Sequence, residues 1–235
     1  MSRKLQTDRP CKQANDNTMK LYLNAVNSHL IEVLDKLMQA PLFNDFILVG
    51  GTSLALQRGH RRSIDIDMFT ALPYGDMPLV EIKDWFVENF ETHEGVELLA
   101  EVRPGYNIYV ANGDAPRIKV DLFYADEFLF PPVVEGIFRM ADERDIAAMK
   151  LLAISGNIKR QKDYWDIHEL MNSYTLNQMI DWTLQRYPYL TRSEIIDGLH
   201  AVDAVEESYE GIVALRPLEY WELNVMDIKE ALARL

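Results

Sequence analysis

Residues 63–69 read Ser63-Ile64-Asp65-Ile66-Asp67-Met68-Phe69, which alternate between polar and apolar with a period of two. This period is typical of a strand with one buried face, and it puts Asp65 and Asp67 on one face and Ile64, Ile66 and Met68 on the other. The two carboxylates then have Cβ atoms roughly 6 to 7 Å apart, which suits a pair of hard cations. The plainer interpretation of the triplet alone is two solvated aspartates on an exposed edge.

A glycine turn precedes this strand. The apolar run Phe46-Ile47-Leu48-Val49 predicts a buried strand, Gly50-Gly51 ends it, and residues 52–58 fit a short helix. The backbone N–H groups of Gly50 and Gly51 and the hydroxyl of Thr52 can cradle phosphate oxygens where that helix begins. A glycine pair is more often only a tight turn, and this one matches neither the P-loop nor the dinucleotide-binding pattern.

A third carboxylate, Asp121, lies on another predicted strand at residues 118–124. If this strand pairs beside the strand at residues 64–69, Asp65, Asp67 and Asp121 meet at one point and can hold two divalent ions. Mg²⁺ suits such a site, with Mn²⁺ as the alternative, because Mg²⁺ prefers a few carboxylates together with substrate phosphates and water. The alternative for Asp121 is a surface aspartate at the end of a strand.

Hydrophobic periodicity predicts the remaining elements. A helix follows Asn17-Thr18, which we interpret as its cap. A surface helix is expected at residues 78–91, and strands at 96–102 and 106–110 are joined at Pro104-Gly105. Five helices are expected near residues 142–155, 161–172, 175–187, 191–201 and 219–233.

This order of elements predicts an α/β (α+β) fold with a mixed sheet, followed by a helical domain. The break Phe130-Pro131-Pro132 lies near the boundary. We expect a flexible arm at residues 1–16, the sheet domain at 17–135 and the helical domain at 136–235. The cleft between the two domains is the expected site.

Composition excludes several classes of protein. The 235 residues contain one cysteine, Cys11, so no intramolecular disulfide can form. The polar start and the absence of a long apolar stretch predict a soluble cytoplasmic protein without a membrane segment. The formal charge of −13 opposes nonspecific capture of nucleic acid. Only the basic clusters at residues 58–62 and 159–162 remain for contact with RNA.

The glycine turn and the aspartate strand together resemble motif I of the AbiEii/AbiGii toxin family of nucleotidyltransferases, within the DNA polymerase β-like superfamily. Lys119-Val120-Asp121 is similar to the next motif of that family. The later helical motifs resemble Asp145-Ile146-Ala147-Ala148-Met149-Lys150-Leu151 and Arg160-Gln161-Lys162-Asp163-Tyr164-Trp165-Asp166-Ile167. The similarity spans about residues 45 to 170 and implies a nucleotidyltransferase fold followed by a helical domain.

The resemblance also implies roles for individual residues. Asp65 and Asp67 would hold the metals, and Asp121 would complete the metal site and help to deprotonate the attacking hydroxyl. The glycine turn and Thr52 would contact phosphates, and Lys150 would balance the charge of the triphosphate. A solvated surface lysine is the alternative for Lys150.

Two further assignments stay open. Arg61, like its neighbours His60 and Arg62, either binds the triphosphate or neutralises the aspartates. Lys162 and Asp163 either lie at the cleft, as the resemblance implies, or belong to the exposed i,i+4 pairs Lys159/Asp163 and Lys162/Asp166.

The function implied is transfer of a nucleoside monophosphate from an NTP to an acceptor hydroxyl, with release of pyrophosphate. Toxins of the family imply the 3′ end of tRNA as an acceptor and a neighbouring antitoxin as a partner, while protein and small-molecule acceptors stay open. The alternative is a noncatalytic module on the same fold that senses a nucleotide or docks a partner.

Overall fold

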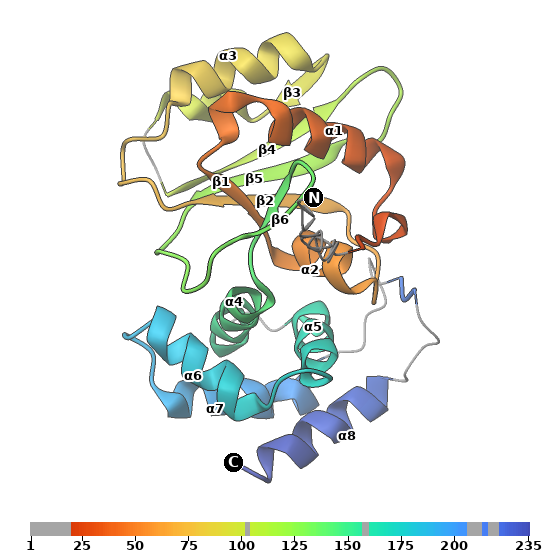
Figure 1. The fold of residues 1–235 in the computed structure, drawn as a ribbon, viewed down its shortest axis with the longest axis vertical. Coiled ribbons are helices and arrows are strands. Elements are labelled where there is room, and N and C mark those ends of the chain that lie inside the picture. The colour runs from red at the N-terminus through yellow and green to blue at the C-terminus, as the bar shows by residue number, and fades with distance from the viewer. Residues whose placement is uncertain (1–19, 102–103, 157–159, 206–212, 216–220) are drawn as a thin grey trace, which may run out of the picture.

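The computed structural model describes residues 20–101, 104–156, 160–205, 213–215 and 221–235. A seven-stranded mixed sheet has the strand order β3-β4-β5-β2-β1-β7-β6. In Figure 1 the sheet lies in the upper half of the molecule with helices α1 and α3, and helices α4 to α8 form the lower half. The strands are β1 (Phe46–Val49), β2 (Asp65–Thr70), β3 (Thr92–Glu94), β4 (Gly105–Ala111), β5 (Ile118–Tyr124), β6 (Val133–Glu135) and β7 (Phe138–Met140).

Helices surround this sheet on two sides. The α-helices are α1 (Ser28–Gln39), α2 (Gly50–Arg58), α3 (Leu79–Asn89), α4 (Glu143–Ser155), α5 (Gln161–Met171), α6 (Leu176–Arg186), α7 (Arg192–His200) and α8 (Trp221–Leu232). Short 3₁₀ helices lie at Leu23–Ala25, Pro41–Phe43, Val96–Ala100 and Ala201–Ala204. The fold class expected from the sequence, a mixed sheet followed by helices, is confirmed.

The central pairing joins β2 to two neighbours. It runs antiparallel to β1 and parallel to β5, and β5 in turn runs antiparallel to β4. Ile66 and Met68 are fully buried and pack with residues of α1 and α3 in one hydrophobic core. The period-two alternation therefore turns the polar residues of β2 to the opposite face, where α1 and α3 do not cover them.

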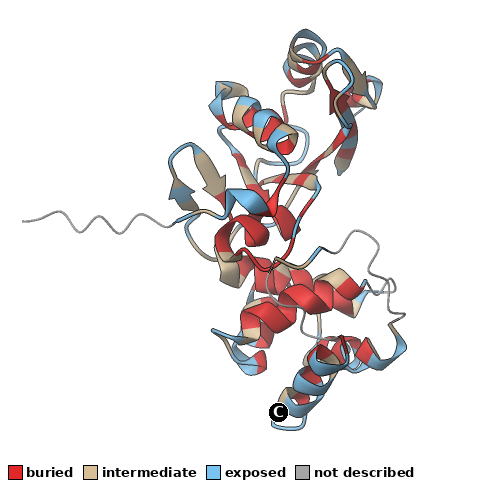
Figure 2. Cartoon of the chain, turned by 90° about the vertical axis from the view of Figure 1, so that its right-hand side faces the viewer, coloured by how far each residue is buried: buried red, intermediate tan, exposed pale blue. Residues whose placement is uncertain are grey.

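A second hydrophobic core binds the helices to the sheet. It joins Val49 of β1 and Leu54 of α2 to buried residues of α4, α5, α6, α7 and α8. Gly198 allows α7 to approach α4 closely, because a Cβ there would lie 2.8 Å from the carbonyl oxygen of Ile154. In Figure 2 buried residues fill the middle of the molecule, where the sheet meets the helices.

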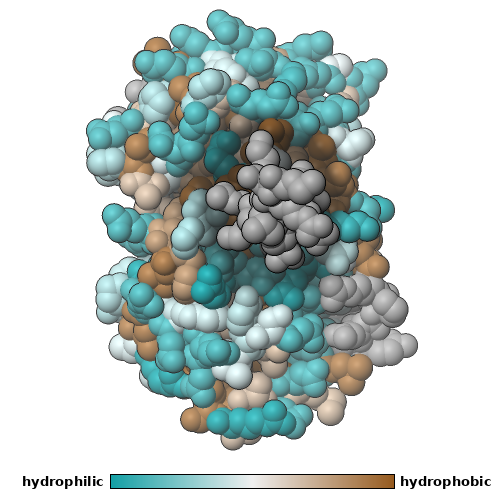
Figure 3. Space-filling view, in the orientation of Figure 1, coloured by the Kyte–Doolittle hydropathy of each residue, from teal (hydrophilic) through white to brown (hydrophobic). Residues whose placement is uncertain are grey.

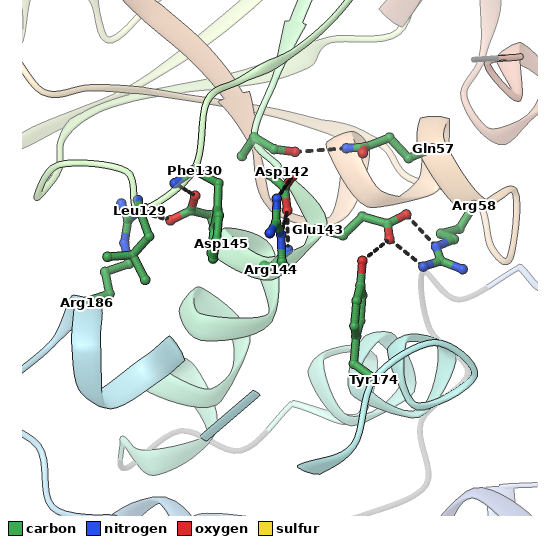
Figure 4. Close-up of polar contacts among 11 residues, drawn as sticks. Gln57, Arg58, Leu129, Phe130, Asp142, Glu143, Arg144, Asp145, Tyr174 and Arg186 are labelled. Carbon is green, nitrogen blue, oxygen red and sulfur yellow. Dashed lines mark hydrogen bonds and ion pairs between the residues drawn. The ribbon is translucent and has the colours of Figure 1, made fainter. Parts of the chain in front are cut away.

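Polar contacts also fix α4 against the sheet domain (Figure 4). Glu143 accepts from the Arg58 guanidinium of α2 and from the Tyr174 hydroxyl, the latter at 3.2 Å. Asp145 is fully buried, where it pairs with Arg186 and accepts from the backbone N–H groups of residues 129 and 130 at 3.0 Å each. These contacts hold α4 and the end of α6 in fixed positions beside the sheet.

Most predicted elements are confirmed, including strands β1 and β5 and the helices from α3 to α8. The first helix starts later than predicted: α1 begins at Ser28, and Asn27 caps it by accepting from the N–H of Leu30. The predicted cap Asn17-Thr18 and the arm at residues 1–16 lie outside the described residues.

Four local predictions differ from the structure. Val96–Ala100 is a 3₁₀ helix instead of a strand. Ile64 precedes β2 and is 56% exposed, so it does not share the buried face. Strand β3 and the hairpin of β6 and β7 were not expected. The sheet extends to Met140 in β7, beyond the expected boundary at 135.

The surface agrees with the charged composition. Hydrophilic residues cover much of the top and bottom of the face in Figure 3, and hydrophobic residues lie in small patches between them. Among the described residues, no helix has the length and apolar character needed to cross a membrane.

Candidate active site

Three aspartates meet on the face of the sheet that α1 and α3 leave uncovered. Asp67 and Asp121 are register partners on the parallel strands β2 and β5, and Asp65 is the partner of Lys119 two residues earlier on the same face. Register partners on neighbouring strands have side chains on the same face, about 5 Å apart. The predicted convergence of these carboxylates, from positions far apart along the chain, is therefore present in the fold.

Each carboxylate has a defined environment. Asp121 is 8% exposed and accepts from Lys119 Nζ at 2.6 Å and from Asn107 Nδ2 at 2.7 Å. Burial, with the negative charges of Asp121 and Asp65, raises the pKa of Asp67 to about 6. Although partial burial opposes it, ion pairing with Asp121 raises the pKa of Lys119. The site thus concentrates negative charge that a cation would neutralise.

The glycine turn lies directly against these side chains. Gly50 has a φ of +68°, and a Cβ at this position would lie 2.5 Å from Asp67 Oδ2. A Cβ on Gly51 would collide with the guanidinium of Arg61. Both positions therefore require glycine, and the first turn of α2 brings backbone N–H groups beside the carboxylates.

Thr52 has a different role from the one expected. Its side chain is buried, and the hydroxyl contacts the carbonyl oxygen of Asp65 and lies 2.7 Å from Ser63 Oγ. It does not line the pocket, whereas Ser63 does. Thr52 therefore fixes the start of β2 against α2, and in this arrangement its hydroxyl does not point toward a phosphate.

A pocket of about 580 Å³ opens over the aspartates, between the sheet and helices α4 and α5. Its lining combines charged and apolar side chains. The charged side chains are Arg61, Asp65, Asp67, Lys119, Asp121, Lys150, Arg160, Lys162 and Asp163, and the apolar and aromatic residues include Val49, Ile64, Phe69, Met149, Leu152, Ala153 and Tyr187. The sequence-predicted residues other than Thr52 thus all line this one pocket.

A buried ion cluster with Asp166 at its centre borders this pocket, whose lining includes its members Arg61, Lys150 and Asp163. Asp166 is fully buried and forms a bidentate ion pair with Arg61, with distances of 2.6 and 2.8 Å. It also contacts His60 Nε2 at 2.8 Å and Lys150 Nζ at 2.7 Å. Although burial raises it, the charges of Arg61 and Lys150 hold the pKa of Asp166 well below its usual range.

Asp163 extends the cluster toward the pocket. It pairs with Lys150 and with Arg160 at 2.7 Å each. The expected exposed pair Lys162/Asp166 does not form, because Asp166 points into the core and is occupied by Arg61. Lys159, the other expected partner, lies outside the described residues.

The three basic side chains that the sequence places near a nucleotide differ in burial and in ion pairing. Arg61 is 3% exposed and Lys150 is 7% exposed, and carboxylates of the cluster hold both. Lys162 is half-buried, and no carboxylate of the described residues forms an ion pair with it. Burial and the neighbouring charge of Arg160 lower the pKa of Lys162.

Three of these residues are missing from the site that the sequence predicts. Asp166 is expected in an exposed pair with Lys162, although it lies within the segment that resembles a helical motif of the family. Asn107 gave no signal, because its contact with Asp121 depends on the register of β4 against β5. Tyr187 reaches the pocket from the end of α6, where Arg186 Nε donates to its hydroxyl at 2.9 Å.

Comparison with known proteins agrees with this geometry. Residues 32–196 match the family model described as nucleotidyl transferase AbiEii toxin, type IV TA system. The chain belongs to this family. The expected enzyme class, nucleotidyltransferase, is therefore confirmed at the level of the AbiEii family, and the description as the toxin of a type IV toxin–antitoxin system implies an antitoxin partner.

Individual relatives were also found. An uncharacterized protein of Aquifex aeolicus (strain VF5) is 31% identical over 206 residues, which cover 81% of this chain and 88% of that protein. Similar solved structures include an antigenic nucleotidyltransferase-like protein from Paracoccidioides brasiliensis, with a TM-score of 0.46, 15% identity and coverage of 87% of this chain and 92% of that one. Another is the Megavirus polyadenylate synthase, with a TM-score of 0.38, 13% identity and coverage of 74% and 36%.

Proposed function

We propose that this member of the AbiEii family transfers a nucleoside monophosphate from an NTP to an acceptor hydroxyl and releases pyrophosphate. The observation that carries the proposal is the register pairing of Asp67 with Asp121, beside a glycine turn that contacts the Asp67 carboxylate. A metal-bound triphosphate needs carboxylates that hold the metal ions and backbone N–H groups that contact the phosphates, and here both lie at the same pocket.

The donor set fits Mg²⁺, with Mn²⁺ as an alternative. Among the described residues, no three His, Cys, Asp or Glu side chains form a ready-made cage for a metal ion. Asp65, Asp67 and Asp121 instead offer hard oxygen ligands at an open pocket, which agrees with the preference of Mg²⁺ for a few carboxylates plus phosphate oxygens. Two bound ions would neutralise the triphosphate and favour ionisation of the attacking hydroxyl.

The chain's own residues bind and orient the triphosphate. Gly50 and Gly51 at the start of α2 line the pocket, and Lys162 and Arg160 at the start of α5 add positive charge to its lining. Lys162 can turn to a phosphate without breaking an ion pair among the described residues. Lys150 and Arg61 contribute charge from fixed positions, because Asp163 and Asp166 hold them.

The nucleobase is expected to contact the apolar part of the pocket lining. Phe69, Tyr187 and, on α4, Met149, Leu152 and Ala153 supply apolar surface there. A base has two apolar faces, so it gains most by lying against such residues. The pocket volume of about 580 Å³ suits a ligand of nucleotide size.

The chemical step is an in-line displacement at the α-phosphorus. The acceptor oxygen forms a bond to phosphorus as the bond to the bridging oxygen of pyrophosphate breaks. Asp121 lies on the side from which the acceptor approaches, so its carboxylate is placed to take the hydroxyl proton. Asn107 orients this carboxylate through its 2.7 Å hydrogen bond.

The acceptor that we propose is the 3′ end of tRNA, and we expect the enzyme to act in the cytoplasm with a cognate antitoxin. The test incubates the purified protein with each labelled NTP, Mg²⁺ and total cellular RNA. Labelled tRNA and released pyrophosphate are the expected products, and Asp65→Asn should abolish both while the protein stays folded. Labelled protein with unlabelled RNA would contradict the RNA acceptor, and Mg²⁺-dependent NTP binding without pyrophosphate release would favour a noncatalytic module.

A further inference from the structure

We propose that the acceptor is a single-stranded RNA end that lies across β5 and β4, with one of its bases stacked on Tyr109. The acceptor face consists of Asn107, Tyr109, Arg117 and Lys119. This inference rests on the proposed function, and it adds a binding surface for the second substrate.

The strand order determines which side of the site the acceptor occupies. The order is β4, β5, β2, β1, so the glycine turn after β1 and the acceptor face on β4 lie on opposite sides of Asp67. Attacking and leaving oxygens are in line at the reacting phosphorus. Because the triphosphate extends toward the glycine turn, the attacking hydroxyl arrives from the side of Asp121 and β4.

Tyr109 is placed to receive a base on that side. It is 40% exposed, whereas its neighbours Ile108 and Val110 are fully buried on the other face of β4. Its register partner on β5 is Lys119, whose partner on β2 is Asp65. Tyr109 therefore lies two strands, or about 10 Å, from the first catalytic aspartate and on the same face. Exposed aromatic rings on a sheet are a common platform for single-stranded bases.

The acceptor face also contacts the catalytic group directly. Asn107 is exposed and donates its hydrogen bond to Asp121, which helps to deprotonate the acceptor in the proposed reaction. The polar face from Tyr109 to Asp121 is thus continuous. No segment of α1 or α3 covers it, because those helices pack on the opposite face with Ile66 and Met68.

The charges on this face suit a phosphate backbone. Lys119 in β5 is the register partner of Tyr109. Arg117 directly precedes β5 and reaches Glu94, which is the register partner of Tyr109 on β3. Arg117 pairs with Glu94 at 2.7 Å, but the two side chains are 59% and 53% exposed. Such an exposed pair contributes little to stability, so a phosphate can replace Glu94 at low cost.

The experiment uses the full chain, one labelled NTP, Mg²⁺ and a fluorescein-labelled single-stranded RNA with a free 3′ hydroxyl. We expect Tyr109→Ala to raise the KM for this RNA by about five- to one-hundredfold, the range for loss of one stacked base. The KM for the NTP should stay unchanged. Tyr109→Phe, which keeps the ring, should behave like the wild type. Arg117→Ala should weaken RNA binding and make it less sensitive to salt.

Tyr74→Ala is the matched control, because Tyr74 is an exposed tyrosine, 62% exposed, that lies between β2 and α3 and not on the acceptor face of β4 and β5. It should leave both KM values unchanged. A Tyr109→Ala protein with an unchanged KM for RNA would overturn the acceptor face while leaving nucleotidyl transfer intact. Transfer by the wild type to protein only would overturn the RNA occupant. Absence of transfer to any acceptor would instead contradict the proposed function.

Discussion

Arg61 and Asp166 lie 105 residues apart and form a bidentate ion pair with distances of 2.6 and 2.8 Å. The pair joins the segment before β2 to helix α5, beneath the pocket. Both side chains are almost completely removed from solvent. Because Gly51 packs against the same guanidinium, this pair connects the glycine turn, the aspartate strand and the helical domain.

We predict that Asp166→Asn is strongly destabilising. The substitution removes the charge that compensates Arg61 and Lys150, and breaking a buried pair in this way costs about 3–5 kcal/mol. Urea unfolding measures the loss. Asp227→Asn is the control, because Asp227 pairs with His168 but its side chain is 57% exposed, and it should cost less than about 1 kcal/mol. Equal effects of the two substitutions would contradict the central role of Asp166.

The outcome at Asp166 shows what the sequence could and could not predict. Alternation at residues 63–69 and 118–124 determines which side chains share a face within one strand, and these faces were predicted correctly for the three aspartates. The parallel pairing of β2 with β5 involves residues more than 50 positions apart, so local periodicity only permits it. Lys162 and Asp166 have the spacing of a surface pair, yet the partner of Asp166 is Arg61 on a distant segment.

Short apolar segments were the other source of error. Val96–Ala100 contains too few residues for its period to distinguish a strand from a helix, and packing against β4 and α3 determines the 3₁₀ conformation. Strands β3, β6 and β7 have three residues each, which is too short for alternation to identify a strand. β6 and β7 form a local antiparallel hairpin, whereas the pairing of β7 with β1 and of β3 with β4 joins residues far apart in the sequence.

We predict that Asp67→Asn stabilises the metal-free protein above pH 6. Burial and the charges of Asp121 and Asp65 raise the pKa of Asp67 to about 6, above the value of about 4 expected in an unfolded chain. A carboxyl group whose pKa is higher in the folded than in the unfolded protein lowers the free energy of unfolding at high pH. This loss of stability disappears as the pH falls toward the pKa of the unfolded state. The variant should be about 1–3 kcal/mol more stable than the wild type at pH 8 in EDTA.

The measurement for Asp67→Asn is thermal unfolding at pH 8 and at pH 4, with and without Mg²⁺. The two proteins should be equally stable at pH 4, and Mg²⁺ should raise the Tm of the wild type only. Asp84→Asn on the exposed surface of α3 is the control and should show no dependence of this kind. A variant that is no more stable than the wild type at pH 8 would contradict the inference that burial and repulsion by Asp65 and Asp121 destabilise the ionised Asp67 carboxylate.

We predict that Tyr187→Leu weakens binding of an NTP and leaves binding of tripolyphosphate unchanged. Tyr187 is the aromatic residue that the end of α6 contributes to the pocket lining, and it carries no positive charge for a phosphate. Loss of one stacking ring costs about fivefold or more in affinity. Calorimetry with each ligand in the presence of Mg²⁺ measures the difference. Equal loss for both ligands would show that the substitution disturbs the whole pocket.

Lys162→Met is predicted to give the opposite pattern, with weaker binding of both NTP and tripolyphosphate. Lys162 lines the pocket and has no ion-pair partner among the described residues, so its ammonium group is available to a phosphate. A charge-assisted hydrogen bond contributes about 1.5–3 kcal/mol, so each dissociation constant should rise roughly tenfold or more. Methionine keeps the length and the apolar stem of lysine, and stability should change little because no ion pair is broken. A variant that binds tripolyphosphate as tightly as the wild type would remove Lys162 from the phosphate site and leave Arg160 and the N-terminus of α2 to bind the triphosphate.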